Sequence, residues 1–203
     1  MRIAALSLSI LSLAACGAAD SGAPKTASGP CGNIQPILDA RTEAEPFLSL
    51  RSKNRMLGDM PLPDSFEGKH AAFGKVCTMN VMNGFGGGSK VYTYSCPLFE
   101  GNSMDREGDQ ARAEAAFDTA AAELKACLGE GWETDEDSEN MDFEVYHKFT
   151  YAPVDMPASA SGFTVDPVYL ELSYTPFMRG RGGASGWQVV LQAQAQVDAP
   201  AEE

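Results

Sequence analysis

The residues that could do chemistry in this chain are two histidines, five cysteines and an acidic run. A hydrolase needs a nucleophile beside a base, but no serine stands in a G-x-S-x-G context. His147 lies on the apolar side of an alternating segment, which is typical of a core histidine rather than a general base. Neither His147 nor His70 has a sequence context that indicates catalysis, so we predict a protein that is not an enzyme.

Residues 3–15 form an apolar and small-residue run behind one positive charge, Arg2. The run is shorter than the roughly 20 residues that a membrane-spanning helix needs, so we interpret residues 1–15 as an export signal. The four residues Leu13-Ala14-Ala15-Cys16 resemble the lipobox of bacterial lipoproteins. The alternative is an ordinary secretory peptide that is cleaved at an Ala-x-Ala site, with Cys16 incidental.

The lipobox resemblance implies that Cys16 carries a diacylglycerol, that cleavage occurs just before it, and that the new amino group is acylated. Two or three acyl chains make membrane attachment stable. The residue after Cys16 is Gly17, whereas an aspartate at this position resembles a signal for retention in the inner membrane. Gly17 therefore favours the outer membrane. The partner implied by the lipobox is therefore a membrane, reached through the N-terminal lipid on the periplasmic side.

The rest of the chain divides by composition into a tether, a body and a tail. Residues 16–30 hold the lipidated cysteine and a flexible tether of small and polar residues, with a reach of roughly 20 Å. Residues 31–197 are long enough for a single globular domain, and residues 198–203 form an acidic tail. The net charge of -13 argues against nucleic-acid binding, which depends on Lys and Arg neutralising phosphates.

Four cysteines remain in the body, an even number that predicts two disulfides in an exported protein: Cys31, Cys77, Cys96 and Cys127. No pair has the C-x-x-C spacing of a zinc site, and we predict no metal and no cofactor. We expect Cys96 to pair with Cys127, which would join a helix to the sheet, and Cys31 to pair with Cys77. The alternative pairs Cys77 with Cys96 across a hairpin.

Hydrophobic periodicity predicts helices near residues 33–50 and at 108–128, the first capped by Asn33 and interrupted at Pro46. Strands are expected at 75–82 and 90–98, which form a hairpin, and at 143–151, 168–175 and 187–197. Residues 52–74 are interpreted as mostly loop with at most one short edge strand. The order α-ββ-α-βββ predicts an α+β fold, an antiparallel sheet of about five strands with helices on one face.

Two further segments hold candidate sites. The acidic run at 133–144 departs from a calcium loop at its sixth and twelfth positions, so an exposed helix-to-strand connection is favoured over calcium binding. The Gly-rich loop between the last two strands carries Phe177, Met178, Arg179 and Arg181, residue types that are enriched at interfaces. Its alternative interpretation is a flexible hairpin end whose arginines pair with nearby acids.

These observations predict a lipid-anchored cell-envelope protein that acts as a non-enzymatic binding or envelope-maintenance module. The loop at 177–181 is the predicted contact for an envelope protein partner. The alternative function is a periplasmic inhibitor of a hydrolase, because a disulfide-bonded sheet with a protruding loop suits that role as well.

Overall fold

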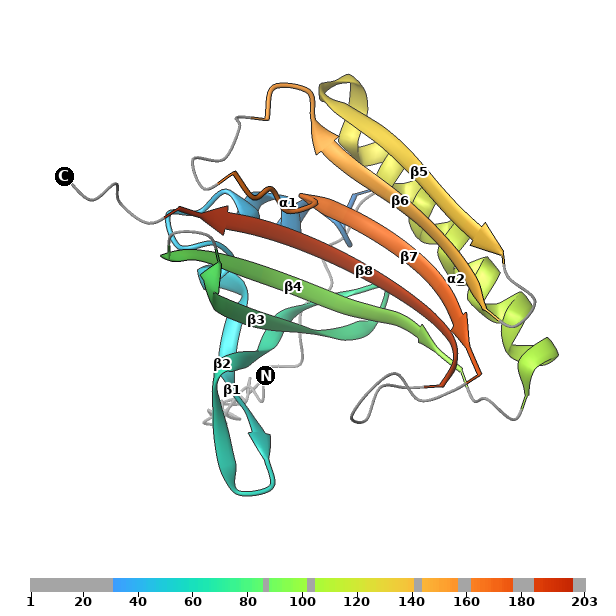
Figure 1. Cartoon of the computed structure of the whole chain (residues 1–203), viewed down its shortest axis with the longest axis horizontal. Coiled ribbons are helices and arrows are strands. Elements are labelled where there is room, and N and C mark those ends of the chain that lie inside the picture. Colours follow the sequence, from blue (N-terminus) through green and yellow to red (C-terminus); the bar gives the residue numbers. More distant parts are fainter. Residues whose placement is uncertain are drawn as a thin grey trace, which may run out of the picture.

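The structure is a computed structural model, and it describes residues 31–85, 88–101, 105–140, 144–156, 162–176 and 185–198. These residues form one eight-stranded antiparallel sheet and two α-helices (Figure 1). The helices are α1 (Gln35–Arg41) and α2 (Arg106–Leu128). The strands are β1 (Arg51–Leu57), β2 (Met60–Ala72), β3 (Lys75–Phe85), β4 (Ser89–Glu100), β5 (Trp132–Asn140), β6 (Val145–Pro153), β7 (Val168–Thr175) and β8 (Gly186–Val197).

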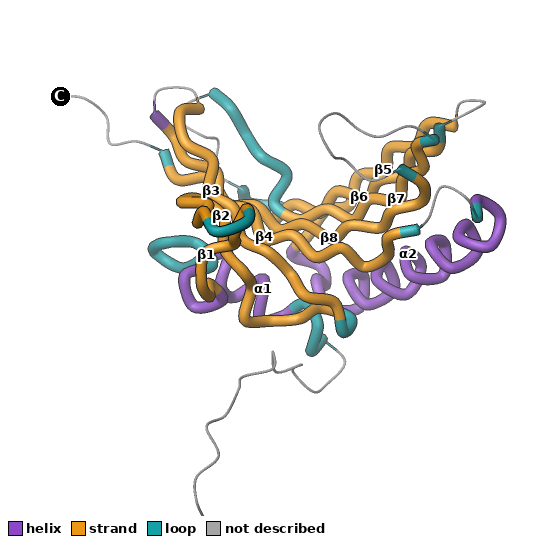
Figure 2. The backbone as a smooth tube through the Cα atoms, turned by 90° about the horizontal axis from the view of Figure 1, so that it is seen from below, coloured by secondary structure: helices purple, strands orange, loops and turns teal. Residues whose placement is uncertain are grey.

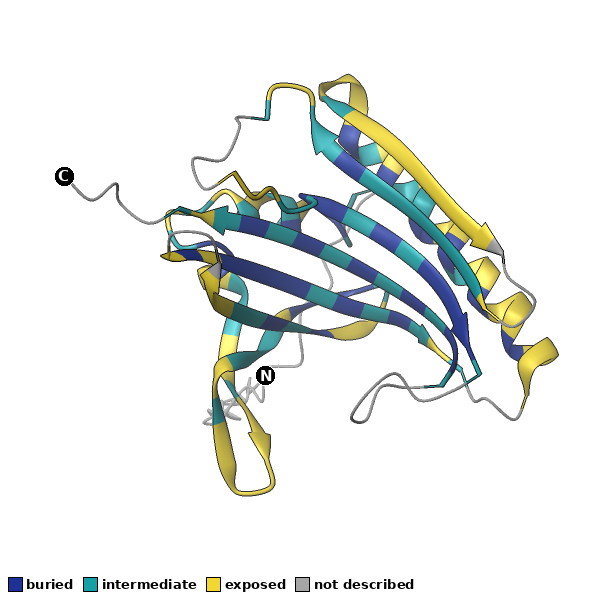
Figure 3. Cartoon of the chain, in the orientation of Figure 1, coloured by how far each residue is buried: buried dark blue, intermediate teal, exposed yellow. Residues whose placement is uncertain are grey.

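The expected α+β fold with about five strands was wrong, since the chain is largely β with eight strands in one sheet. Three strands account for the difference. β1 and β2 occupy residues 51–72, which were interpreted as loop, and β5 occupies most of the acidic run. Most side chains of β1 and β5 are exposed (Figure 3), and in β2 only the last three residues, His70 to Ala72, are buried. None of the three strands therefore shows the apolar alternation by which strands are recognised.

The strands run in the order β1-β2-β3-β4-β8-β7-β6-β5 across the sheet. Along the chain, a helix, a short 3₁₀ turn and four strands occur twice, as α1, η1 (Leu48–Leu50) and β1–β4, then as α2, η3 (Gly129–Gly131) and β5–β8. The two sets of four strands meet at the central β4–β8 pair. The sheet therefore has two outer edges, one formed by β1 and the other by β5.

The core lies between the sheet and the two helices, α1 and α2. Alternate residues of β8 are buried, from Trp187 to Ala195, and pair in register with the buried side chains of β4 and β7. The helix contributes one buried stripe: Asp109, Ala113, Phe117, Ala120, Leu124 and Leu128. Figure 2 shows α2 below the strands that it packs against, and contacts place it on β4, β7 and β8. The helix predicted at 108–128 is thus confirmed.

Asn33 does not cap α1, as the sequence predicted, because Ile34 is the N-cap residue and no side chain caps the helix. The Asn33 side chain instead donates to Glu123 Oε2 of α2 at 2.9 Å and accepts from the backbone N–H of Phe73 at 2.8 Å. Asn33 also accepts a bond through its carbonyl oxygen from His70 Nε2 at 3.0 Å. This residue therefore joins the start of α1 to β2 and α2.

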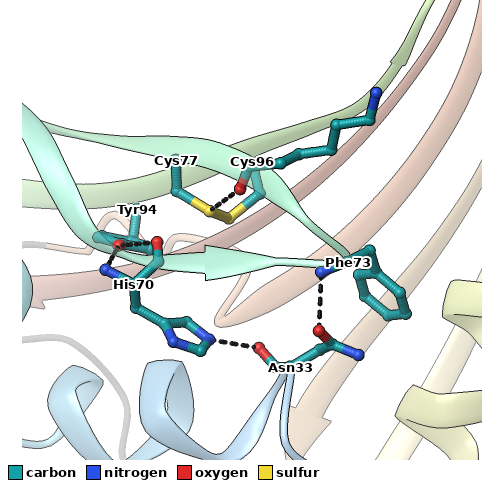
Figure 4. The surroundings of a disulfide bond; sticks show 7 residues. Asn33, His70, Phe73, Cys77, Tyr94 and Cys96 are labelled. Carbon is teal, nitrogen blue, oxygen red and sulfur yellow. Dashed lines mark hydrogen bonds between the residues drawn. A yellow bond between two sulfur atoms is a disulfide. The ribbon is translucent and has the colours of Figure 1, made fainter. Parts of the chain in front are cut away.

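Two disulfides are present, but the favoured pairing was wrong: Cys77 bonds Cys96, and Cys31 bonds Cys127. Cys77 and Cys96 lie on neighbouring strands with their Cα atoms 4.2 Å apart (Figure 4), the separation of directly opposed residues in a non-hydrogen-bonded pair. Cys127 is half-buried and is not one of the buried residues of α2. It reaches the segment before α1 instead.

Candidate functional site: the outer edge of β5 and the grooves beside it

The residues predicted to make partner contacts lie outside the described part of the chain. Cys16 precedes the first described residue, and the loop with Phe177, Met178, Arg179 and Arg181 falls between described residues 176 and 185. The structure therefore neither brings these residues together nor separates them. The candidate site must be built from other groups.

Both histidines have structural partners in the described chain. His70 is buried, and its backbone N–H and C=O bond the hydroxyl of Tyr94 at 3.2 and 2.8 Å (Figure 4). His147 lies on the side of the sheet that faces α2, with its ring 4.8 Å from the rings of both Phe117 and Phe149. Its Nε2 is 2.8 Å from Glu136 Oε1. Within the described residues, no serine, threonine or cysteine side chain bonds either histidine, which is consistent with packing roles.

The acidic run is not a connection between helix and strand, as the sequence predicted, because it forms most of β5. Glu136 lies on the face toward α2, where it contacts His147. The other four carboxylates of the strand share the face that points away from α2: Glu133, Asp135, Asp137 and Glu139. We call this set the acidic row. Neighbouring members are about 6.6 Å apart along an extended strand. A period-two pattern of acids was visible in the sequence, but strand recognition depends on alternating apolar residues, and here both faces are polar.

The acidic row keeps its negative charge because the cation opposite it is already engaged. Lys148 of β6 pairs in register with Asp137. Its ammonium is held by Asp166 Oδ2 at 2.6 Å and lies 4.5 Å from the centre of the Tyr169 ring. Burial lowers the pKa of Lys148, but the hydrogen bond and the charge of Asp166 outweigh it and raise this pKa above its ordinary value. None of the four carboxylates forms an ion pair with another described residue.

Two hollows lie beside β5, one near each end of the strand. The first, which we call the apolar groove, has a volume of about 310 Å³ between α2 and β5–β6 and is lined by Ala121, Ala122, Lys125, Thr134, Phe149 and Tyr151. The second, the acidic hollow, has about 300 Å³ and is lined by Asp137, Glu139, Glu144, Val145, Tyr146 and Tyr174. Burial raises the pKa of Tyr151 to about 12, so its phenol in the groove is neutral at pH 7.

The apolar groove exists because α2 packs on β4, β8 and β7 and diverges from the outer strands. Phe149 of β6 stacks on Phe117 of α2 with ring centres 5.4 Å apart, and this contact closes the inner wall. Beyond it the helix presents the small side chains of Ala121 and Ala122, which leave room beneath Thr134 of β5. The groove is therefore a consequence of small residues on α2 and of a polar edge strand that does not cover them.

The described residues contain no group of three or more His, Cys, Asp or Glu side chains that could hold a metal ion. The acids of β5 are spread along an extended strand rather than gathered around a point. No helix within the described ranges is long and apolar enough to cross a membrane. Comparison of the chain with protein-family models, with curated sequences and with solved structures gives no match.

Proposed function

We propose that this protein is a lipid-anchored cell-envelope protein that faces the periplasm at the outer membrane and acts as a non-enzymatic binding or envelope-maintenance module. The lipobox at Leu13–Cys16 supports the anchor and the compartment. The two disulfides are consistent with that compartment, because such bonds form and persist in oxidising environments.

The observation that carries the binding role is the chemistry of the β5 edge. The four carboxylates of the acidic row have no ion-pair partner among the described residues, and beside them lies a groove whose lining is largely apolar. Such a combination of unpaired charge and accessible apolar surface suits recognition of another molecule. Nine in-register residue pairs with β6 hold that surface on the sheet.

The test of the anchor is the mass and the location of the full chain expressed in a Gram-negative host. We expect the intact mass of the mature protein to include a diacylglyceryl group on Cys16, and the protein to sediment with outer-membrane fractions. The matched control is Cys16→Ala, which should leave the protein unacylated. An unmodified N-terminus at Cys16 in the native protein would contradict the proposal.

A second candidate function, inhibition of a periplasmic hydrolase, is favoured by the β1–β2 hairpin, which projects from the body (Figure 1). Its end exposes Met56, Leu57 and Met60, at 55, 65 and 59% of their surface. Large apolar side chains in such a position indicate an interaction site. The test adds purified protein to periplasmic extracts that degrade peptidoglycan, protein or lipid. Loss of one activity, restored by replacing the three residues with serine, would support inhibition over the first proposal.

A further inference from the structure

The outer edge of β5 is open to another strand. β5 pairs with β6 on one side, and no strand of the described chain pairs with its other side. The strand is nine residues long, about 30 Å when extended. A long exposed edge is a template for strand addition, in which a peptide forms main-chain hydrogen bonds and places alternate side chains on the two faces of the sheet.

The two faces at this edge differ in chemistry, and each selects one kind of side chain. Away from α2, the acidic row offers a carboxylate at every second position, which matches the spacing of alternate side chains on an added strand. Toward α2, the apolar groove opens beneath Thr134 beside Ala121 and Ala122. An added strand would therefore place basic side chains on the outer face and apolar side chains on the inner face.

The positions of the two hollows agree with this alternation. Thr134 of the apolar groove and Glu139 of the acidic hollow are five residues apart on β5. An odd separation puts residues on opposite faces of a strand. A single extended segment can therefore fill the groove with an apolar side chain and reach the acidic hollow with a basic one, about 16 Å further along.

We propose that the β5 edge binds an extended peptide segment in which basic and apolar residues alternate, as a ninth strand of the sheet. This inference deepens the proposed binding role and rests on it. A second copy of this chain is not the occupant, because two acidic rows would face one another at close range and like charges opposite each other destabilise strand pairing. The partner is instead a protein that carries such a cationic segment.

The test uses a synthetic probe of nine residues in which lysine and valine alternate, with the mature protein carrying all four body cysteines. The first control has the same composition but five lysines followed by four valines. The second replaces every lysine of the alternating peptide by glutamate. We expect saturable binding of the alternating lysine peptide by isothermal titration calorimetry, with affinity at least tenfold higher than that of either control and falling as salt rises.

Variants of the protein separate the two faces. Asp135→Asn with Asp137→Asn removes two exposed charges without changing side-chain size, and we expect affinity for the probe to fall about three- to tenfold. The matched control, Asp59→Asn with Asp64→Asn, makes the same charge change on the distant β1–β2 hairpin and should bind normally. Ala122→Gln extends a polar side chain from an exposed position of α2 into the groove and should weaken binding to a similar degree.

Main-chain pairing has its own measurement, since charge alone would also attract a lysine-rich peptide. Two versions of the probe carry N-methyl groups at alternate residues. One version is methylated at the odd-numbered residues (the first frame) and the other at the even-numbered residues (the second frame). In an added strand only one frame directs its N–H groups toward β5, so we expect one version to lose binding and the other to keep it. Equal effects of the two frames, or equal binding of the block control, would overturn the proposal.

The alternative is that the carboxylates of the acidic row serve only to prevent another strand from pairing with β5. In that case Asp135→Asn with Asp137→Asn would make the protein self-associate, while the native protein would bind no probe at millimolar concentration. This result would refute the strand-addition proposal and leave the lipid anchor and the general binding role untouched. Those depend on acylation of Cys16 and on partners recovered from the native membrane.

Discussion

Removal of each disulfide in turn should reduce stability by amounts that the loop lengths set. The Cys31–Cys127 bridge spans 96 residues and the Cys77–Cys96 bridge spans 19. In the chain-entropy model, the Cys31–Cys127 bridge raises the free energy of unfolding by about 4.7 kcal/mol and the Cys77–Cys96 bridge raises it by about 3.2 kcal/mol. The longer bridge therefore contributes about 1.5 kcal/mol more through the unfolded state alone.

The burial of the cysteines acts in the opposite direction, because it makes removal of the shorter bridge more destabilising. Cys77 and Cys96 are fully buried, whereas Cys127 and Cys31 are half-buried. Replacing the buried pair by alanine removes core atoms as well as the bond, and cavities in a core add to the loss. Replacing it by serine would instead bury two hydroxyls. Alanine is therefore the cleaner substitution, and a cavity cost of about 1–2 kcal/mol would bring the two double variants close together.

The assay is urea unfolding of the native protein, of Cys31→Ala with Cys127→Ala, and of Cys77→Ala with Cys96→Ala. Hydrogen exchange separates the contributions. Loss of the longer bridge should raise hydrogen exchange in α1 first, because this helix has only seven residues and Cys31 lies just before it. Loss of the shorter bridge should raise exchange in β3 and β4.

Peptide mapping of the oxidised native protein that shows Cys96 joined to Cys127 would contradict these expectations. An unchanged urea midpoint together with unchanged exchange of α1 after removal of the longer bridge would contradict them as well. The four-alanine variant supplies the control for additivity, since the two bridges share no partner and their effects should add.

Three further changes test the packing and the titration of the core. Gly68→Ala would place a methyl group 2.4 Å from the Tyr94 hydroxyl and should cost about 1–3 kcal/mol in urea unfolding, whereas Gly131→Ala, with nothing within 4 Å, should cost little. Tyr94→Phe leaves the buried backbone groups of His70 without the hydroxyl and should cost about 1–3 kcal/mol by the same measurement. Burial raises the pKa of both Tyr94 and Tyr151 from 10.0 to about 12, so the unfolded chain loses these protons at lower pH than the folded chain. The free energy of unfolding should therefore be unaffected by these groups below pH 10 and fall between pH 10 and 12. Tyr94→Phe should reduce that fall.

The sequence predicted those elements whose apolar residues follow a clear period. The apolar stripe from Ala113 to Leu128 predicted α2, and the apolar alternation from Trp187 to Val197 predicted β8. Both patterns are clear because each element buries one face against the other. The β1–β2 hairpin was missed because its far end touches no core. Pro61 and Pro63 lie where β2 pairs only with β1, and there a missing N–H on the open side costs little.

The candidate site was largely beyond prediction. The acids at 133–139 carry the period of a strand, but the free edge appears only when the order of all eight strands is known. The apolar groove depends on where α2 diverges from β5 and β6, which no local pattern states. The sequence offered the Cys77–Cys96 pairing as the alternative across the hairpin, but choosing it required the register set by the β3–β4 turn.

The repeated order of a helix and four strands has a consequence for the order of oxidation. Cys77 and Cys96 lie within the first set of strands, so their thiols can meet as soon as β3 and β4 pair. Cys31 and Cys127 belong to different sets, and α1 itself rests on β8, the last strand of the chain. The Cys31–Cys127 bond can therefore form in its native geometry only after the C-terminal half of the chain has been synthesised and β8 has paired. A chain halted before β8 should accumulate with one bridge made and Cys31 still reactive.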